Sequence, residues 1–120
     1  MKIAEIIAGN QNCSALITGE SVGQVASQTI YALGCTDAAT QMPVFRPCIG
    51  MDKDEIIRIS REIDTFQTSI LPYEDCCTVF TPKHPKTRPH LDEIIEAEKA
   101  LDSEALIARA VAGARKTVVK

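Results

Sequence analysis

The 120-residue sequence contains no tryptophan, and aromatic residues make up only 4% of it. Its core must therefore be built from Ile, Leu, Val and Ala, within a hydrophobic fraction of 45%. No apolar run approaches the roughly 20 residues that a membrane-spanning helix needs, so we expect no membrane partner. The net charge of −3 excludes a global attraction to nucleic acid, and any such attraction must be local.

Signatures of disulfide frameworks and zinc sites are also missing. The chain has five cysteines, an odd number, and no Cys-x-x-Cys pair. The N-terminus carries an early acid, Glu5, and no apolar segment of the kind found in secretory signal peptides. Reduced thiols and a cytoplasmic location are therefore expected.

Short apolar runs alternate with helical stripes along the chain. Buried parallel strands are predicted at residues 14–18 and 42–50. Helices are predicted at residues 3–8, 22–33, 55–63 and 91–101, and from residue 102 onward. This order predicts an α/β fold with a short parallel sheet and C-terminal helices. Because two strands are too few for a stable sheet, we expect a partner, a second copy or further strands to complete it.

The first candidate site is the turn that joins the first predicted strand to the following helix, from Gly19 to Gln28. Open α/β sheets bind ligands at such strand ends, and glycines there allow close approach to the backbone. Ser21 and Gln24 have the spacing of a capping box. A simple turn and a capped helix explain the pattern equally well, and no Gly-rich phosphate-binding motif occurs in the chain.

The second candidate site is the pair Cys76 and Cys77, in a proline-rich loop without helical or strand periodicity. A nucleophilic or sulfur-carrying cysteine needs the thiolate form, which cations in the run Lys83–Arg88 favour. Glu74 and Asp75 oppose this effect, so the sequence leaves the sign of the pKa shift open. An inert loop is the alternative.

A metal site in the same loop is disfavoured. Cys76, Cys77, His84 and His90 provide enough ligands in number. Adjacent cysteines, however, are poorly placed to bind one tetrahedral ion. We therefore predict no metal centre.

The third candidate site is the basic run itself, with Lys83, Lys86 and Arg88. Three fixed charges in a loop stiffened by prolines suit contacts to nucleic-acid phosphates. A solvated loop explains the same composition.

Three long segments carry a resemblance to a known family: Thr18–Thr29, Arg46–Lys53 and Ile70–Pro89. Together they closely resemble the tRNA 4-thiouridine synthetases, the ThiI-type sulfurtransferases. The resemblance implies a Rossmann-like, three-layer adenylating domain of the PP-loop type, which uses ATP with Mg²⁺ to activate a tRNA uridine. A cysteine desulfurase would supply the sulfur, and the family is also linked to the sulfur of the thiamine thiazole.

The resemblance also assigns individual residues. Gly19 and Gln28 fall at positions that the family uses to bind ATP. Cys76 matches the cysteine that handles sulfur, with Cys77 as a neighbour found in part of the family. The basic run becomes a candidate tRNA contact.

The sequence departs from the family in one large respect, because the Ser-Gly-Gly-x-Asp-Ser pyrophosphate loop is absent. We therefore interpret residues 1–101 as the C-terminal half of an adenylating domain and residues 102–120 as a C-terminal helix. On this interpretation the chain alone does not adenylate tRNA. A non-catalytic sulfur carrier or a self-associating module is the alternative.

Overall fold

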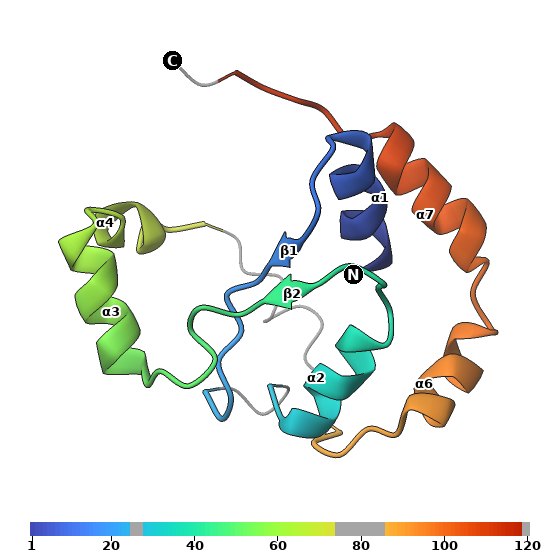
Figure 1. Ribbon diagram of the computed structural model, residues 1–120, viewed down its shortest axis with the longest axis horizontal. Coiled ribbons are helices and arrows are strands. Elements are labelled where there is room, and N and C mark those ends of the chain that lie inside the picture. Colours follow the sequence, from blue (N-terminus) through green and yellow to red (C-terminus); the bar gives the residue numbers. More distant parts are fainter. Residues whose placement is uncertain (25–27, 74–85, 119–120) are drawn as a thin grey trace.

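The computed structural model describes residues 1–24, 28–73 and 86–118. The order of elements is helical at both ends, with two short strands between. In Figure 1 the strands lie at the centre, with α3 and α4 on one side of them and the other helices on the opposite side. The elements are α1 Lys2–Asn10, β1 Leu16–Ile17, α2 Ile30–Asp37, β2 Val44–Phe45, α3 Lys53–Glu62, α4 Phe66–Ser69, α6 Leu91–Glu98 and α7 Ser103–Ala112.

The two strands form the parallel sheet that the sequence predicts. Leu16 pairs with Val44 and Ile17 with Phe45. Both strands are shorter than predicted, with two residues each. The hydrogen-bonded ladder between them is correspondingly short. It extends from the Leu16 N–H, which donates to Pro43, to the Thr18 N–H, which donates to the Phe45 carbonyl. The α/β class with a short parallel sheet is confirmed.

The prediction of a helix over residues 22–33 is wrong in its position. Residues 22–24 form a turn, and α2 begins only at Ile30. The Thr29 side chain caps this helix by accepting a hydrogen bond from the Ala32 N–H at 3.2 Å. The predicted capping box at Ser21 does not form, because its hydroxyl donates instead to the Met51 carbonyl at 2.7 Å. A tertiary contact has replaced the local one.

A capping box does form before α3, where Asp52 and Glu55 have the spacing of this motif. The Asp52 side chain accepts from the Glu55 N–H at 2.8 Å, and the Glu55 side chain accepts from the Asp52 N–H at 2.9 Å. Such reciprocal bonds satisfy two backbone donors that a helix start leaves free. The short α4, which the sequence did not indicate, follows α3, and Arg61 lies over the Phe66 ring at 4.6 Å from its centroid.

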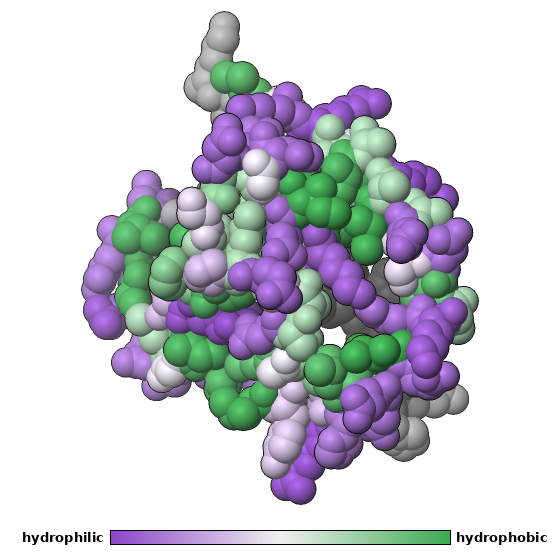
Figure 2. All heavy atoms as spheres, turned by 45° about the vertical axis from the view of Figure 1, so that its right-hand side comes forward, coloured by the Kyte–Doolittle hydropathy of each residue, from purple (hydrophilic) through white to green (hydrophobic). Residues whose placement is uncertain are grey.

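The core of the described chain is small. Only Ala8, Leu16 and Leu33 are buried hydrophobic residues there. Helix α1 packs on α7 and on β1, while α2 packs on α6 (Figure 1). Many large apolar side chains stay on the surface, and Figure 2 shows hydrophobic patches separated by hydrophilic residues on the face in view. No helix in the described part of the chain is long and apolar enough to cross a membrane.

Candidate nucleotide and RNA site

The loop that follows β1 closes on itself through the predicted site residue Gln28. The side-chain oxygen of Gln28 accepts a hydrogen bond from the Ser21 N–H at 3.0 Å. The Gln28 backbone carbonyl accepts another from the Gly23 N–H at 3.1 Å. Gly23 has a φ of 82°, in the left-handed region that glycine adopts without strain. These two bonds fix Gln28 beside residues 21–23.

A second set of bonds fixes this loop to the segment that follows β2. Ser21 is only 2% exposed, and its hydroxyl reaches the Met51 carbonyl. The Val22 N–H donates to the Ile49 carbonyl at 3.0 Å. The carboxyl ends of the two parallel strands thus carry loops that are bonded to each other, at the edge where α/β sheets bind ligands.

Gly19 lies in the same loop, two residues after the end of β1. It is exposed, and a Cβ added there would meet no atom within 4 Å. The side of the loop at Gly19 therefore faces open space rather than packed protein. A ligand can approach the backbone there without displacing a side chain.

Charged groups that the sequence did not single out as a site cluster at this edge. Arg46 donates from Nε to Glu20 at 2.8 Å and from a terminal nitrogen to Asp37 at 2.5 Å. The Thr18 hydroxyl also donates to Glu20, at 2.7 Å. The hydrogen bond to Asp37, followed by the bond to Glu20, raises the pKa of Arg46 above its ordinary value. The guanidinium is therefore a permanent charge that holds two loops and the end of α2 together.

The sequence placed only Glu20 at this edge, shortly after the first predicted strand. Arg46 lies inside the second predicted strand, residues 42–50, and follows a strand only because β2 ends at Phe45. Asp37 carried no such signal, because its approach to Arg46 depends on where α2 begins and ends. Its sequence context suggested only a turn or a cap.

The segment Lys86–Pro89, which carries part of the basic run, lies against α2. The Thr29 hydroxyl donates to the Thr87 carbonyl at 2.8 Å, and the Cys35 thiol approaches the Pro89 carbonyl at 3.8 Å. The Arg88 guanidinium lies over the Tyr31 ring, 5.6 Å from its centroid. A pocket of about 280 Å³ lies between the two segments, and Gln28 and Arg88 both line it. The structure thus brings a predicted ATP residue and a predicted RNA residue to one pocket.

Lys86 is the other described member of the basic run. It is exposed and donates to Glu93 of α6 at 2.5 Å. This bond, and a weaker one from the His90 N–H, lower the pKa of the Glu93 carboxyl below its ordinary value. A phosphate that binds Lys86 would have to compete with this carboxylate.

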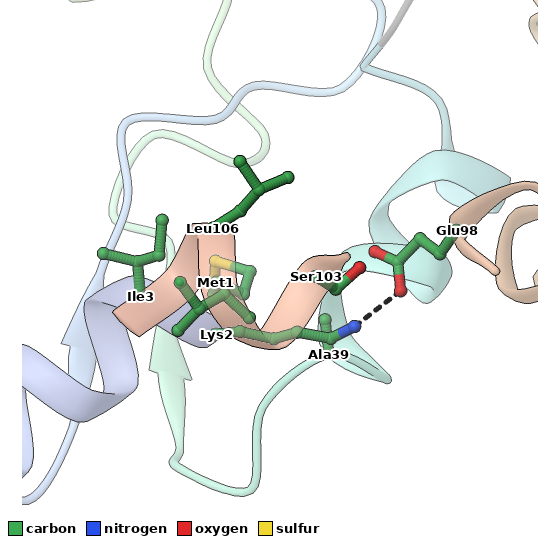
Figure 3. Close-up of a pocket in the computed structure, with 8 residues that line it drawn as sticks. Met1, Lys2, Ile3, Ala39, Glu98, Ser103 and Leu106 are labelled. Carbon is green, nitrogen blue, oxygen red and sulfur yellow. Dashed lines mark hydrogen bonds and ion pairs between the residues drawn. The ribbon is translucent and has the colours of Figure 1, made fainter. Parts of the chain in front are cut away.

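The remaining predicted site residues, Cys76, Cys77 and Lys83, lie outside the described residues. Within the described ranges, no group of three or more His, Cys, Asp or Glu side chains could hold a metal ion. Another hollow, of about 260 Å³, lies between α1 and α7 and contains none of the predicted site residues. In Figure 3 an ion pair joins Lys2 to Glu98, and Ile3 and Leu106 contribute apolar lining to the hollow. It has the character of an incompletely packed helix junction.

Comparisons with known proteins give the fold and the family of the chain. A solved structure of a 4-thiouridine synthetase–RNA complex with bound ATP superposes with a TM-score of 0.86 at 42% sequence identity. The match covers 93% of this chain and 29% of that one. The fold is therefore the α/β fold of a segment of such a synthetase.

The sequence comparisons give the family. The model of the ThiI family, described as thiamine biosynthesis protein, matches residues 1–103, and the chain belongs to this family. The probable tRNA sulfurtransferase of Alkaliphilus oremlandii is 59% identical over 111 residues. That of Acetivibrio thermocellus is 60% identical over 111 residues. Both matches cover 92% of this chain, which spans 28% of the length of either relative.

Proposed function

We propose that this chain supplies one wall of the ATP site and the sulfur-accepting thiol of a tRNA sulfurtransferase. The observation that supports this most directly is the pair of hydrogen bonds that join Gln28 to Ser21 and Gly23 at the carboxyl edge of the sheet. Relatives that are 57–60% identical are named probable tRNA sulfurtransferases. In the proposed division, residues 1–101 belong to the adenylating domain. Residues 102–120, predicted as one helix, form a C-terminal segment in which the helix α7 ends at Ala112.

The loop offers chemistry that suits a nucleotide. The Gln28 side chain uses its oxygen within the loop, and its amide nitrogen carries two further N–H donors. Gly19 leaves its backbone accessible. ATP, bound with Mg²⁺, would supply the adenylyl group that activates a tRNA uridine. The described residues include no carboxylate cluster for the ion, so we assign Mg²⁺ no ligand in this part of the chain.

Cys76 is the proposed sulfur acceptor, with Cys77 as the alternative. Its thiolate would attack the outer sulfur of a persulfide on a cysteine desulfurase, and the thiolate of the desulfurase would leave. The product is a persulfide on Cys76, which is the sulfur that the complete enzyme passes to the activated uridine to give 4-thiouridine. The same persulfide would serve the thiamine thiazole. We propose that this takes place in the cytoplasm.

The basic run is the proposed tRNA contact. Lys83, Lys86 and Arg88 carry fixed charges close to the cysteine pair in sequence. Lys86 already pairs with Glu93, so its contribution to phosphate binding depends on exchanging one anion for another.

Sulfur loading tests the proposal. The purified chain is incubated with a cysteine desulfurase and cysteine, and its intact mass is measured. We expect an adduct about 32 Da heavier, one persulfide sulfur, that disappears in Cys76→Ser and persists in Cys77→Ser. No adduct on either cysteine would refute the acceptor role. ATP–pyrophosphate exchange by the chain alone should be absent, because the sequence has no pyrophosphate loop.

A self-associating, non-catalytic module is the second candidate function. One observation favours it: the paired residues Ile17 and Phe45 of the sheet are 74% and 59% exposed. An apolar sheet face of this kind favours association with a second copy, and a homo-oligomer would cover it. Sedimentation velocity over a range of concentrations tests this function. It requires that the chain associates even when neither cysteine carries persulfide sulfur.

A further inference from the structure

The pocket between α2 and the Lys86–Pro89 segment has a composition that the proposed ATP and phosphate contacts leave unexplained. Apolar atoms dominate its lining, although Gln28, Thr29, Thr87 and Arg88 border it. The apolar surface comes in part from the Tyr31 ring and the Ile30 side chain, which are 51% and 67% exposed. A phosphate group makes no use of an exposed aromatic ring. A flat, hydrophobic ligand group can stack on one.

Tyr31 is held in place for such a contact. It lies in the first turn of α2, two residues after the Thr29 cap, so the helix start fixes its backbone. The Arg88 guanidinium covers the ring at 5.6 Å from the centroid, within the range of a cation–π contact. The segment that carries Arg88 is in turn fixed to α2 by the bond from Thr29 to Thr87. Aromatic ring and guanidinium plane thus form a small stacking platform with bonded supports on both sides.

We infer that this platform binds an unpaired base of the RNA substrate by stacking on Tyr31 and Arg88. Aromatic rings and arginine planes are the groups on which proteins stack splayed-out RNA bases. Arg88 belongs to the basic run that the proposed function assigns to RNA, so a base and its neighbouring phosphate would meet adjacent groups. The inference rests on that proposed function and identifies the part of the RNA that the site recognises.

An RNA base fits this pocket better than the adenine of ATP does. Arg88, which the proposed function assigns to RNA, lines the pocket, whereas Gly19, which it assigns to ATP, does not. A base that belongs to a polymer can bind in a shallow pocket, because contacts elsewhere on the RNA contribute to affinity. ATP at the same place is the competing outcome of the test.

The two tyrosines of the chain allow a direct test. The sequence has no tryptophan, so Tyr73→Phe leaves Tyr31 as the single fluorophore, and Tyr31→Phe leaves Tyr73 alone. Tyr73 is 94% exposed and does not line the pocket, which makes it a matched control. We expect a short oligouridine to quench Tyr31 emission in Tyr73→Phe and to leave Tyr73 emission in Tyr31→Phe largely unchanged. Fully double-stranded RNA should quench neither, and ATP at equal base concentration should not quench Tyr31.

Affinity provides the second readout. Stacking on one aromatic ring typically contributes enough that Tyr31→Leu should weaken oligouridine binding roughly 5- to 150-fold. Tyr31→Phe should keep most of the affinity, and Tyr73→Leu all of it. Circular dichroism spectra that match the parent chain would show that the variants fold.

Four results would overturn the inference: RNA binding without quenching of Tyr31, equal quenching of both tyrosines, stronger quenching by ATP, or no RNA binding. None of these touches sulfur loading of Cys76. A chain that takes up sulfur but does not quench therefore refutes the base platform and leaves the acceptor role standing.

Discussion

The carboxyl edge of the sheet and the outward faces of the same sheet and helices are built on opposite principles. At the edge, Arg46 binds two carboxylates and Ser21 is almost fully buried with its hydroxyl bonded. On the outward faces, Ile17 and Phe45 stay exposed, and the hollow between α1 and α7 has apolar lining beside the ion pair that joins Lys2 of α1 to Glu98 of α6. At the carboxyl edge, the polar groups form hydrogen bonds and ion pairs with one another. The outward faces present apolar surface that a contact with another molecule would cover.

The interactions that define the shape of the proposed ligand edge therefore differ from those that stabilise the folded chain. Hydrogen bonds and ion pairs define the geometry of the proposed ligand edge, while the buried apolar core that stabilises a domain is small here. We therefore expect the ligand edge to be sensitive to single polar substitutions. The outward faces should respond to substitution through association, and their effect on unfolding should be small.

The largest expected effect comes from two neighbouring residues of β1. Leu16→Ala truncates one of the three buried hydrophobic residues in the described part of the chain and should lower the free energy of unfolding by about 2–4 kcal/mol. Ile17→Ala, one residue along the strand and 74% exposed, should cost less than about 1 kcal/mol. Urea denaturation followed by circular dichroism measures both. Equal losses would mean that the two faces of the sheet are not different.

The next effect concerns Arg46. Arg46→Ala leaves Glu20 and Asp37 without their shared partner and should destabilise the chain by about 1–3 kcal/mol. Arg58→Ala is the matched control, because the Arg58–Glu62 pair is exposed on α3 and should contribute about 0.5 kcal/mol or less. If both substitutions cost the same in urea denaturation, Arg46 does not hold the edge together.

A smaller effect should follow pH at the Lys86–Glu93 pair. The pKa of Glu93 is lowered in the folded chain, so its contribution to stability is present above the ordinary glutamate pKa of about 4.3 and is lost as the pH falls through the lowered value. Glu93→Gln should therefore lower the melting temperature near neutral pH and have little effect in strong acid. A gap of constant size at every pH would contradict this assignment.

The smallest effect on unfolding is expected for the exposed sheet face. The double substitution Ile17→Thr and Phe45→Thr introduces threonine, which has good strand propensity, and removes apolar surface. Monomer stability should change little, whereas any concentration-dependent association in sedimentation velocity should weaken. Unchanged association would show that this face is not the contact surface.

Local patterns in the sequence predicted the elements whose contacts are local. Asp52 and Glu55 form their capping box because both partners lie three residues apart. The start of α2 was missed because Ser21 bonds to Met51, 30 residues away, and because Thr29 caps the helix instead. The parallel sheet followed from two apolar runs, but its short length depended on where the hydrogen-bonded ladder ends.

The candidate site shows the same division. Gly19, Gln28 and Arg88 were indicated by the sequence, through strand-end placement, resemblance to a family and fixed charge. Tyr31 was not, because its value as a platform comes from Arg88, which is 57 positions away in a chain that the fold brings back to α2. The Arg46 cluster was missed for the same reason, since Asp37 gains its role only from the fold.

Exchange of this segment within a complete relative tests the central claim most directly. The probable tRNA sulfurtransferase of Alkaliphilus oremlandii is 59% identical over the 111 matched residues. In the experiment, this chain replaces the matching segment of that relative. We predict that the chimaera forms 4-thiouridine in tRNA, measured by mass spectrometry of nucleosides. Activity should be lost in its Cys76→Ser variant and reduced in its Gln28→Ala variant. A folded chimaera that makes no 4-thiouridine, or one that works equally well with Cys76→Ser and Cys77→Ser together, would contradict the account.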